Sequence, residues 1–172
     1  MNSCDYNGKM GERIIATLFP HFQFSSPTQD QAGIDGFLGG LSVQIKADDG
    51  IAIWRNLYHE YWERSHEGQP WRKSPSCADL FFFVTAGLYV QLPAHELCLL
   101  EVGLPMVRIK PRGRDTSIGL LIALSRVPHT WVHSHTLWEP FADPPASRPP
   151  RTITDLSFDE LDGCEKPGAV LG

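Results

Sequence analysis

The sequence predicts an α/β layered sandwich, and three observations lead to this class. A helical period comes first, a glycine-turn hairpin follows, and β-rich runs then alternate with short helical segments. Helices that pack on a sheet show this kind of alternation. The chain has 172 residues, of which 42% are hydrophobic and 20% charged. It is therefore long enough to bury a core and has the composition of a globular protein.

The first predicted element is an amphipathic helix over residues 8–19. Glu12 falls in the same i, i+3, i+4, i+7 stripe as Ile15, Ala16 and Phe19. A carboxylate that points toward a core is costly unless it is paired, hydrogen-bonded or bound to a metal ion. The alternative is that Glu12 lies at the edge of the stripe and extends its carboxylate into solvent.

The second element is a hairpin around the Gly-Gly pair at residues 39–40. Glycine favours this turn because it adopts the positive φ angles that two-residue hairpin loops require. Apolar and polar residues alternate over residues 41–47, as expected for a strand with one buried face. With a two-residue loop, Asp35 faces Gln44 across the hairpin, and Lys46 lies one diagonal step away. The hairpin is therefore expected to gather a carboxylate, an amide and an ammonium group.

The remaining elements continue the alternation. Residues 51–66 predict a helix with an aromatic stripe, and core packing is a better interpretation of this stripe than a base-stacking platform. The stripe consists of Trp54, Tyr58, Tyr61 and Trp62. After it, the sequence predicts strands over residues 78–85 and 88–92, a short helix over 93–100 that begins at a proline, and strands over 106–110 and 118–124.

The composition changes at residue 139, which divides the chain into a domain (1–138) and a Pro-rich acidic tail (139–172). The tail holds six of the fourteen prolines and carries seven acids against three Lys or Arg, a net charge of −4. The domain has a net charge of only −1. We expect the tail to be extended, with one or two helical turns beginning at Ser157, where Glu160 completes the spacing of a capping box.

A basic strip interrupts the nearly neutral domain. Arg108, Lys110, Arg112 and Arg114 recur at alternate positions. Such a strip can bind a nucleic-acid backbone, although alternating charge is also typical of a solvated strand face. The acidic tail is expected to fold back over the strip and compete with nucleic acid. The alternative is a disordered tail that contacts nothing.

The residues gathered by the hairpin suit the hydrolysis of a phosphodiester bond. This reaction needs a metal that activates water and neutralises charge in the transition state. Mg²⁺ prefers oxygen ligands, and one or two carboxylates with carbonyl oxygens suffice. Asp35 is expected to be the central ligand, and Glu12, the Gln44 side chain or the Ile45 carbonyl would complete the set. Lys46 would position or help deprotonate the attacking water.

The order of these residues resembles the PD-(D/E)XK nuclease superfamily. The pattern consists of Glu12 on a first helix, Asp35 before a turn and the Gln44–Lys46 segment on the next strand. It looks closest to the pattern of archaeal-type Holliday junction resolvases and of end-cleaving nuclease subunits of transposons, in which glutamine can occupy the second acidic position. The resemblance extends over residues 8–125. It implies a restriction-endonuclease-like three-layer α/β/α sandwich with a mixed central sheet. It also implies a DNA endonuclease that uses Mg²⁺, with Mn²⁺ as a substitute.

The sequence departs from the family pattern at two positions. Ile34 replaces the proline of the motif, and Gln44 replaces an acid. The second change removes a negative charge, so metal affinity is expected to be lower unless Glu12 compensates. Nearby carboxylates could act as substitutes, although they are more typical of loops. They are Asp30, Asp48 and Asp49.

Two other function classes remain open. The first is a non-catalytic module on the same fold that binds nucleic acid or protein, and Lys46 beside Asp35 argues against it. The second is a zinc site at His129, His133 and His135, which lacks a suitably spaced fourth ligand.

The sequence also predicts where the protein works. No apolar run approaches the roughly 20 residues of a membrane span, and the first residues lack the layout of a signal peptide. We therefore expect a cytoplasmic protein with no membrane association. Its four cysteines are widely spaced and are expected to be reduced. The expected partner, from the nuclease resemblance, is DNA. A homodimer is left open.

Overall fold

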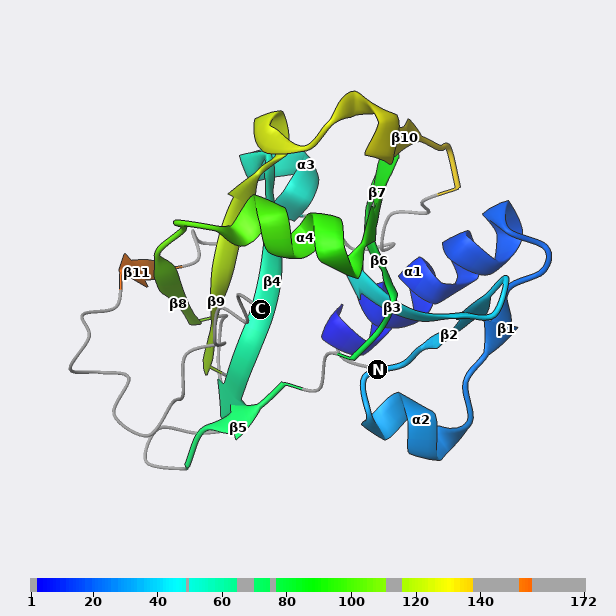
Figure 1. Ribbon diagram of the computed structural model, residues 1–172, viewed down its shortest axis with the longest axis horizontal. Helices are drawn as coiled ribbons and strands as arrows, with labels where there is room; N and C mark the ends of the chain where they lie inside the picture. The colour runs from blue at the N-terminus through cyan, green and yellow to red at the C-terminus, as the bar shows by residue number, and fades with distance from the viewer. Residues whose placement is uncertain are drawn as a thin grey trace.

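The computed structural model describes residues 3–48, 50–64, 70–74, 77–110, 116–137 and 152–155, and here the chain forms two β-sheets with short helices (Figure 1). Sheet A contains, in spatial order, β1 (Gln23–Phe24), β2 (Gly36–Leu38), β3 (Leu41–Ala47), β6 (Leu80–Thr85), β7 (Leu88–Pro93) and β10 (Val132–Ser134). Sheet B contains β11 (Thr152–Asp155), β8 (Met106–Lys110), β9 (Thr116–Ala123), β4 (Asn56–Arg64) and β5 (Arg72–Lys73). The helices are α1 (Ser3–Leu18), α2 (Pro27–Gln31), α3 (Gly50–Trp54) and α4 (Ala94–Glu101), followed by the 3₁₀ turns η1 (Leu124–Arg126) and η2 (His129–Trp131).

The predicted α/β class with a mixed sheet is confirmed. In sheet A, β3 and β6 run parallel and the other neighbouring strands run antiparallel. Sheet B is antiparallel throughout. The sequence did not predict this second sheet.

The two faces of sheet A bury different cores. On one face, Met10, Ile14 and Ile15 of α1 pack against alternate residues of β3 and β6, such as Val43 and Phe82. On the other face, buried residues of β6 and β7 pack with residues of β4, β9 and α4. Figure 1 shows α4 lying across the front of the molecule between the two sheets, and it contacts β6, β7 and β9. The second face of sheet A therefore looks toward sheet B.

The predicted hairpin is present, and its register agrees with the prediction from the turn to the pair of Gly36 and Val43. Gly39 and Gly40 have φ angles of +60° and +86°, which only glycine adopts easily. Leu38 pairs with Leu41, and Gly36 pairs with Val43. The strands predicted over 78–85, 88–92, 106–110 and 118–124 and the helix predicted over 93–100 are also present, with slightly different ends.

The helix predicted over residues 51–66 is wrong. Only α3 is helical, and Arg55 then adopts a positive φ of 57° before β4 begins. Leu57 and His59 alternate toward the buried side of β4, so the period is two rather than 3.6. The aromatic spacing is misleading because a β-bulge at Tyr61 shifts the alternation halfway along the strand.

A short part of the predicted tail belongs to a sheet. Residues 152–155 form β11, which pairs antiparallel with β8 over Val107 to Lys110. The tail therefore returns to the strand that carries the start of the basic strip. The helical turn predicted at Ser157 lies outside the described residues. None of the helices in the described segments has the length and apolar character of a membrane span.

Candidate functional site

The end of the β2–β3 hairpin places Asp35 against β3. The ladder stops at the pair of Gly36 and Val43, and the Asp35 N–H donates to the Val43 carbonyl at 2.8 Å. The Asp35 carboxylate then accepts a hydrogen bond from the Ile45 N–H. Asp35 therefore does not form the predicted backbone pair with Gln44. Instead, its side chain takes the place that a ladder carbonyl would occupy.

Gly36 permits this arrangement. A Cβ at this position would lie 2.3 Å from Phe22 Cζ and 2.5 Å from the Gln23 carbonyl oxygen, both far inside van der Waals contact. Only glycine fits between β1 and β3 at this point. The absence of a side chain at Gly36 therefore allows the backbone beside Asp35 to lie this close to Phe22 and Gln23.

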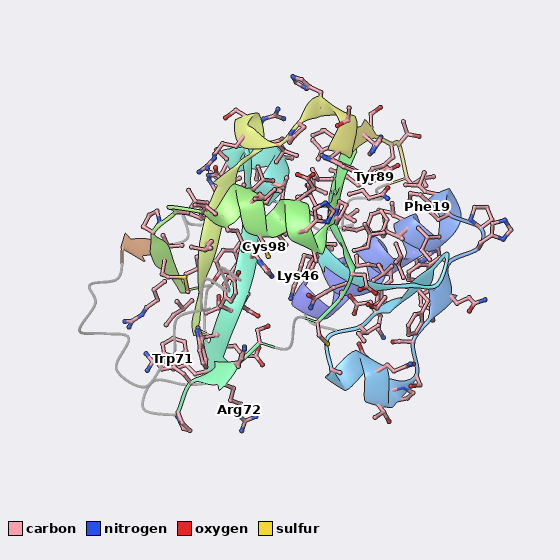
Figure 2. The ribbon with its side chains drawn as sticks, in the orientation of Figure 1. Phe19, Lys46, Trp71, Arg72, Tyr89 and Cys98 are labelled. Atoms are coloured by element: carbon pink, nitrogen blue, oxygen red, sulfur yellow. The ribbon has the colours of Figure 1, made fainter. Side chains whose placement is uncertain are left out.

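Gln44 and Lys46 point to the face of sheet A that looks toward sheet B. In the parallel ladder they pair with Phe81 and Phe83, which belong to the core between the sheets. Paired residues point to the same side of a sheet. Gln44 is only 4% exposed, whereas Lys46 is half-buried. Figure 2 shows Lys46 in the space between β3 and β4.

Glu12 of α1 is half-buried. Burial is the largest cause that raises the pKa of its carboxyl, followed by repulsion from Asp35 and then Asp30. Burial also raises the pKa of Asp35, while the Ile45 hydrogen bond and Lys46 act in the opposite direction. The charge of Asp35 thus acts on Glu12, and the charge of Lys46 acts on Asp35. The convergence of all four predicted residues on one pocket stays a prediction.

The other predicted carboxylates have different roles. Asp30 is exposed on α2 and repels both site carboxylates. Asp48 Oδ1 accepts the Gly50 N–H at 2.8 Å at the start of α3, and Asp49 lies outside the described residues. Within the described segments, no three His, Cys, Asp or Glu side chains are arranged to hold a metal. A metal in this site would therefore need neutral oxygen ligands beside Glu12 and Asp35.

Sequence reasoning missed a second polar cluster. His59 Nδ1–H donates to Glu101 Oε1, and the Tyr61 hydroxyl donates to Glu101 Oε2 at 2.6 Å. Burial and Glu101 raise the pKa of Tyr61 well above its usual range, so the hydroxyl remains a donor. Burial and Glu101 also raise the pKa of the Cys98 thiol, which disfavours a reactive thiolate. Burial of a charged side chain at the end of α4 is visible only in three dimensions.

The zinc alternative is not supported by the histidine geometry. His135 is buried, and its Nε2 lies 2.8 Å from the Thr85 carbonyl oxygen. Its Nδ1 accepts the Leu137 N–H at 3.2 Å, so both ring nitrogens are engaged. His133 stacks on Tyr89 with 4.8 Å between ring centroids. These histidines hold β10 and the segment after it against β7.

The basic strip is described only in part. Arg108 is half-buried on β8, where its guanidinium lies 5.8 Å from the Trp71 ring centroid. Lys110 ends β8, and its backbone pairs with Thr152 of β11. Arg112 and Arg114 lie outside the described residues. Their expected contacts with nucleic acid therefore stay a prediction.

Comparisons with known protein families, with characterised proteins and with solved structures return no match to this chain. The likeness to PD-(D/E)XK nucleases therefore stays a prediction from the residues themselves.

Proposed function

We propose that the protein is a metal-dependent nuclease that hydrolyses phosphodiester bonds in DNA. The observation that carries the proposal is the half-buried Asp35 carboxylate at the end of the hairpin, which the Ile45 N–H holds and which interacts electrostatically with Glu12 and with Lys46. Two half-buried carboxylates that repel each other lower the stability of a protein unless a cation offsets their charge. A lysine on the neighbouring strand is then well placed to act on a phosphate or a water molecule.

The residues present fit a magnesium ion. Mg²⁺ commonly uses one or two carboxylates and retains several water ligands, so Glu12 and Asp35 are sufficient charged ligands. The Gln44 amide oxygen and the Ile45 carbonyl are the neutral candidates. When bound, Mg²⁺ would supply an acidified water and offset charge on the phosphate.

Each of the protein's own residues would have a separate role in the reaction. The Ile45 N–H holds the Asp35 carboxylate in a fixed orientation. The Lys46 ammonium would donate a hydrogen bond to a phosphate oxygen or to the attacking water, and its charge acts on Asp35. Glu12 on α1 would fix the second side of the site. Orientation of this kind is where most of the rate enhancement in such reactions arises.

The proposal extends to the fold. We propose that α1, sheet A and α4 correspond to the helix, mixed sheet and second helix of a restriction-endonuclease-like three-layer core. The parallel pairing of β3 with β6 beside an antiparallel hairpin supports this correspondence. Sheet B is then an addition to the core.

A cleavage assay on the full chain tests the proposal. Labelled linear duplex, branched and single-stranded DNA are incubated with Mg²⁺, Mn²⁺ or a chelator. We expect cleavage of at least one substrate with either metal and none with chelator. Glu96→Gln is the matched control, because it removes a carboxylate in the first turn of α4 that is outside the proposed site, and it should cleave normally.

A second candidate function is a non-catalytic nucleic-acid- or protein-binding module on this fold. Gln44 favours it, because an amide replaces one acid of the expected site. Binding of DNA without cleavage under every metal condition would support this candidate and reject the nuclease. If the protein neither binds nor cleaves any of the DNAs, both nucleic-acid proposals are wrong.

A further inference from the structure

A cluster of cations surrounds Trp71 at the β5 end of sheet B. The Arg64 guanidinium lies 4.5 Å from the Trp71 ring centroid, and that of Arg108 lies 5.8 Å from it. Both distances are within the range of cation–π contacts. Trp71 is half-buried, and it brings together arginines from β4 and β8, which are not adjacent strands.

The strand register shows which face of sheet B carries the cluster. Ile118 pairs with both Trp62 and Arg108, and Ile122 two steps along the same side of β9 belongs to the core between the sheets. Paired residues share a face, so Arg108 lies on the face that looks toward sheet A. Arg64 is two residues beyond Trp62 and shares this face.

The same rule separates the two exposed cations of β5. Lys73 pairs with Trp62 and therefore joins the face of the cluster. Arg72 pairs with Glu63 and points to the opposite face. Figure 2 shows Trp71 beside the strands of sheet B and Arg72 extending away from them. The chain thus offers two neighbouring cations of similar exposure on opposite faces.

The charges of the cluster point to an anionic ligand. Among the described residues, no carboxylate forms an ion pair with Arg64 or Lys73. Within these segments Arg64 Nε is also buried without a hydrogen-bond partner, and the Arg64 guanidinium lies over the Trp71 ring. Like charges held together in this way repel each other, and a polyanion that binds them removes the repulsion.

We propose that Arg64, Lys73 and Arg108, arranged around Trp71, bind the phosphate backbone of the DNA substrate. This inference rests on the proposed function for the identity of the ligand. Guanidinium groups match the geometry of phosphate oxygens. Arg64 covers a face of the Trp71 ring, so the ring orients a guanidinium rather than stacking on a base. The contact is therefore independent of DNA sequence.

The position of the cluster suits a nuclease whose chemistry occurs at Lys46. Lys46 and the cluster lie on the faces that sheets A and B turn toward each other. A DNA backbone seated on the cluster would therefore be presented to the side of sheet A that carries Lys46. The cluster adds affinity, and the hairpin site supplies the chemistry.

Anisotropy measurements with labelled duplex DNA in chelator test binding without cleavage. Arg64→Gln combined with Lys73→Gln should weaken binding about tenfold or more at low salt, and the slope of log K against log salt should fall by roughly two. Lys73→Gln alone should lower the slope by about one. Arg72→Gln is the matched control and should change affinity less than twofold. Thermal unfolding verifies that each variant is folded.

The Trp71 ring is tested separately. Trp71→Phe retains an aromatic face and should keep most of the affinity, whereas Trp71→Leu should lose several-fold because the guanidiniums are no longer held in place. Equal loss in both variants, with normal thermal unfolding, would contradict the role of the ring.

The outcomes separate this inference from the proposed function. Unchanged affinity in the folded double variant, or an equal loss with Arg72→Gln, overturns the cluster even if the protein cleaves DNA. Weakened binding by a protein that never cleaves keeps the cluster and rejects the nuclease. If both hold, the double variant should raise the KM for cleavage and leave kcat unchanged.

Discussion

Two polar clusters, one between β4 and α4 and one at the end of the β2–β3 hairpin, are built in contrasting ways. Around His59, each polar group has a partner: Glu101 accepts hydrogen bonds from both His59 and Tyr61. Around Asp35, burial raises the pKa of both Asp35 and Glu12, and repulsion between carboxylates adds to the rise; the Ile45 hydrogen bond and Lys46 oppose it at Asp35, and Lys9 opposes it at Glu12. The first cluster is expected to stabilise the fold. The second lowers stability, which is typical of residues retained for function.

The largest expected effect is on the chemistry of the Asp35 cluster. Asp35→Ala and Lys46→Ala should each reduce cleavage by about a thousandfold or more, because they remove groups that act on the reacting phosphate rather than packing. Single-turnover cleavage with saturating DNA measures this loss. Thermal unfolding of Lys46→Ala should stay close to that of the wild type, whereas Asp35→Ala also removes the acceptor of the Ile45 N–H and should unfold at a lower temperature. Wild-type cleavage by both alanine variants would show that the active site lies elsewhere.

The two clusters should respond oppositely when a carboxylate is removed. Glu101→Ala leaves His59 and Tyr61 buried without their acceptor and should lower the free energy of unfolding by about 3–5 kcal/mol. Asp35→Asn retains an acceptor for the Ile45 N–H and removes a repelling charge. Its free energy of unfolding should therefore fall by no more than about 0.5 kcal/mol. Urea titration of both variants measures the contrast. A larger loss for Asp35→Asn than for Glu101→Ala would reverse our assignment of the two clusters.

The next effect concerns Gln44, a proposed neutral ligand of the metal ion. Gln44→Glu places a carboxylate at a position that is 4% exposed, so it should destabilise the metal-free protein by about 1–3 kcal/mol. A bound cation should offset this cost, and the variant should gain more stability from Mg²⁺ than the wild type does. Thermal unfolding with and without Mg²⁺ measures the gain. Equal gains in both proteins would place Gln44 outside the metal site.

The sequence predicted the register of the β2–β3 hairpin because its signals are local. A Gly-Gly turn and an alternating strand determine the pairing from the turn back to Gly36 and Val43. The exact end of the ladder did not follow, because it depends on the contact of Gly36 with Phe22 and the Gln23 carbonyl.

The second cluster and sheet B were beyond sequence reasoning for a physical reason. Glu101 and His59 are 42 positions apart in the chain, and neither lies in a pattern that marks it as buried. Tyr61 occupies the bulge of β4, and this bulge gave the segment a false helical period. The spacing of residues along the chain does not indicate which distant antiparallel strands pair.

The acidic tail should have a smaller effect, on affinity alone. β11 pairs with β8, the strand that carries Arg108. Truncation after Trp138 removes a net charge of −4 and should tighten DNA binding a few-fold at low salt, with a smaller gain at higher salt. Binding in chelator at two salt concentrations measures this change. Weaker binding after truncation would instead indicate that β11 supports the DNA-binding face.

The smallest expected effect concerns a clip between β3 and β6, away from both clusters. Asp79 Oδ2 accepts the Ser42 N–H at 2.9 Å and the Ser42 hydroxyl at 2.6 Å, and these bonds lower the pKa of Asp79. A carboxyl whose pKa is lower in the folded state stabilises the fold above its unfolded pKa of about 3.9 and loses this effect as the pH falls through the folded value. The Tm of Asp79→Asn should therefore lie slightly below that of the wild type at pH 7, and the two should converge below about pH 3.9. Because Asp79 is exposed, salt should also narrow the difference. A gap of constant size from pH 7 to pH 3 would mean that the clip acts through hydrogen-bond geometry alone and not through charge.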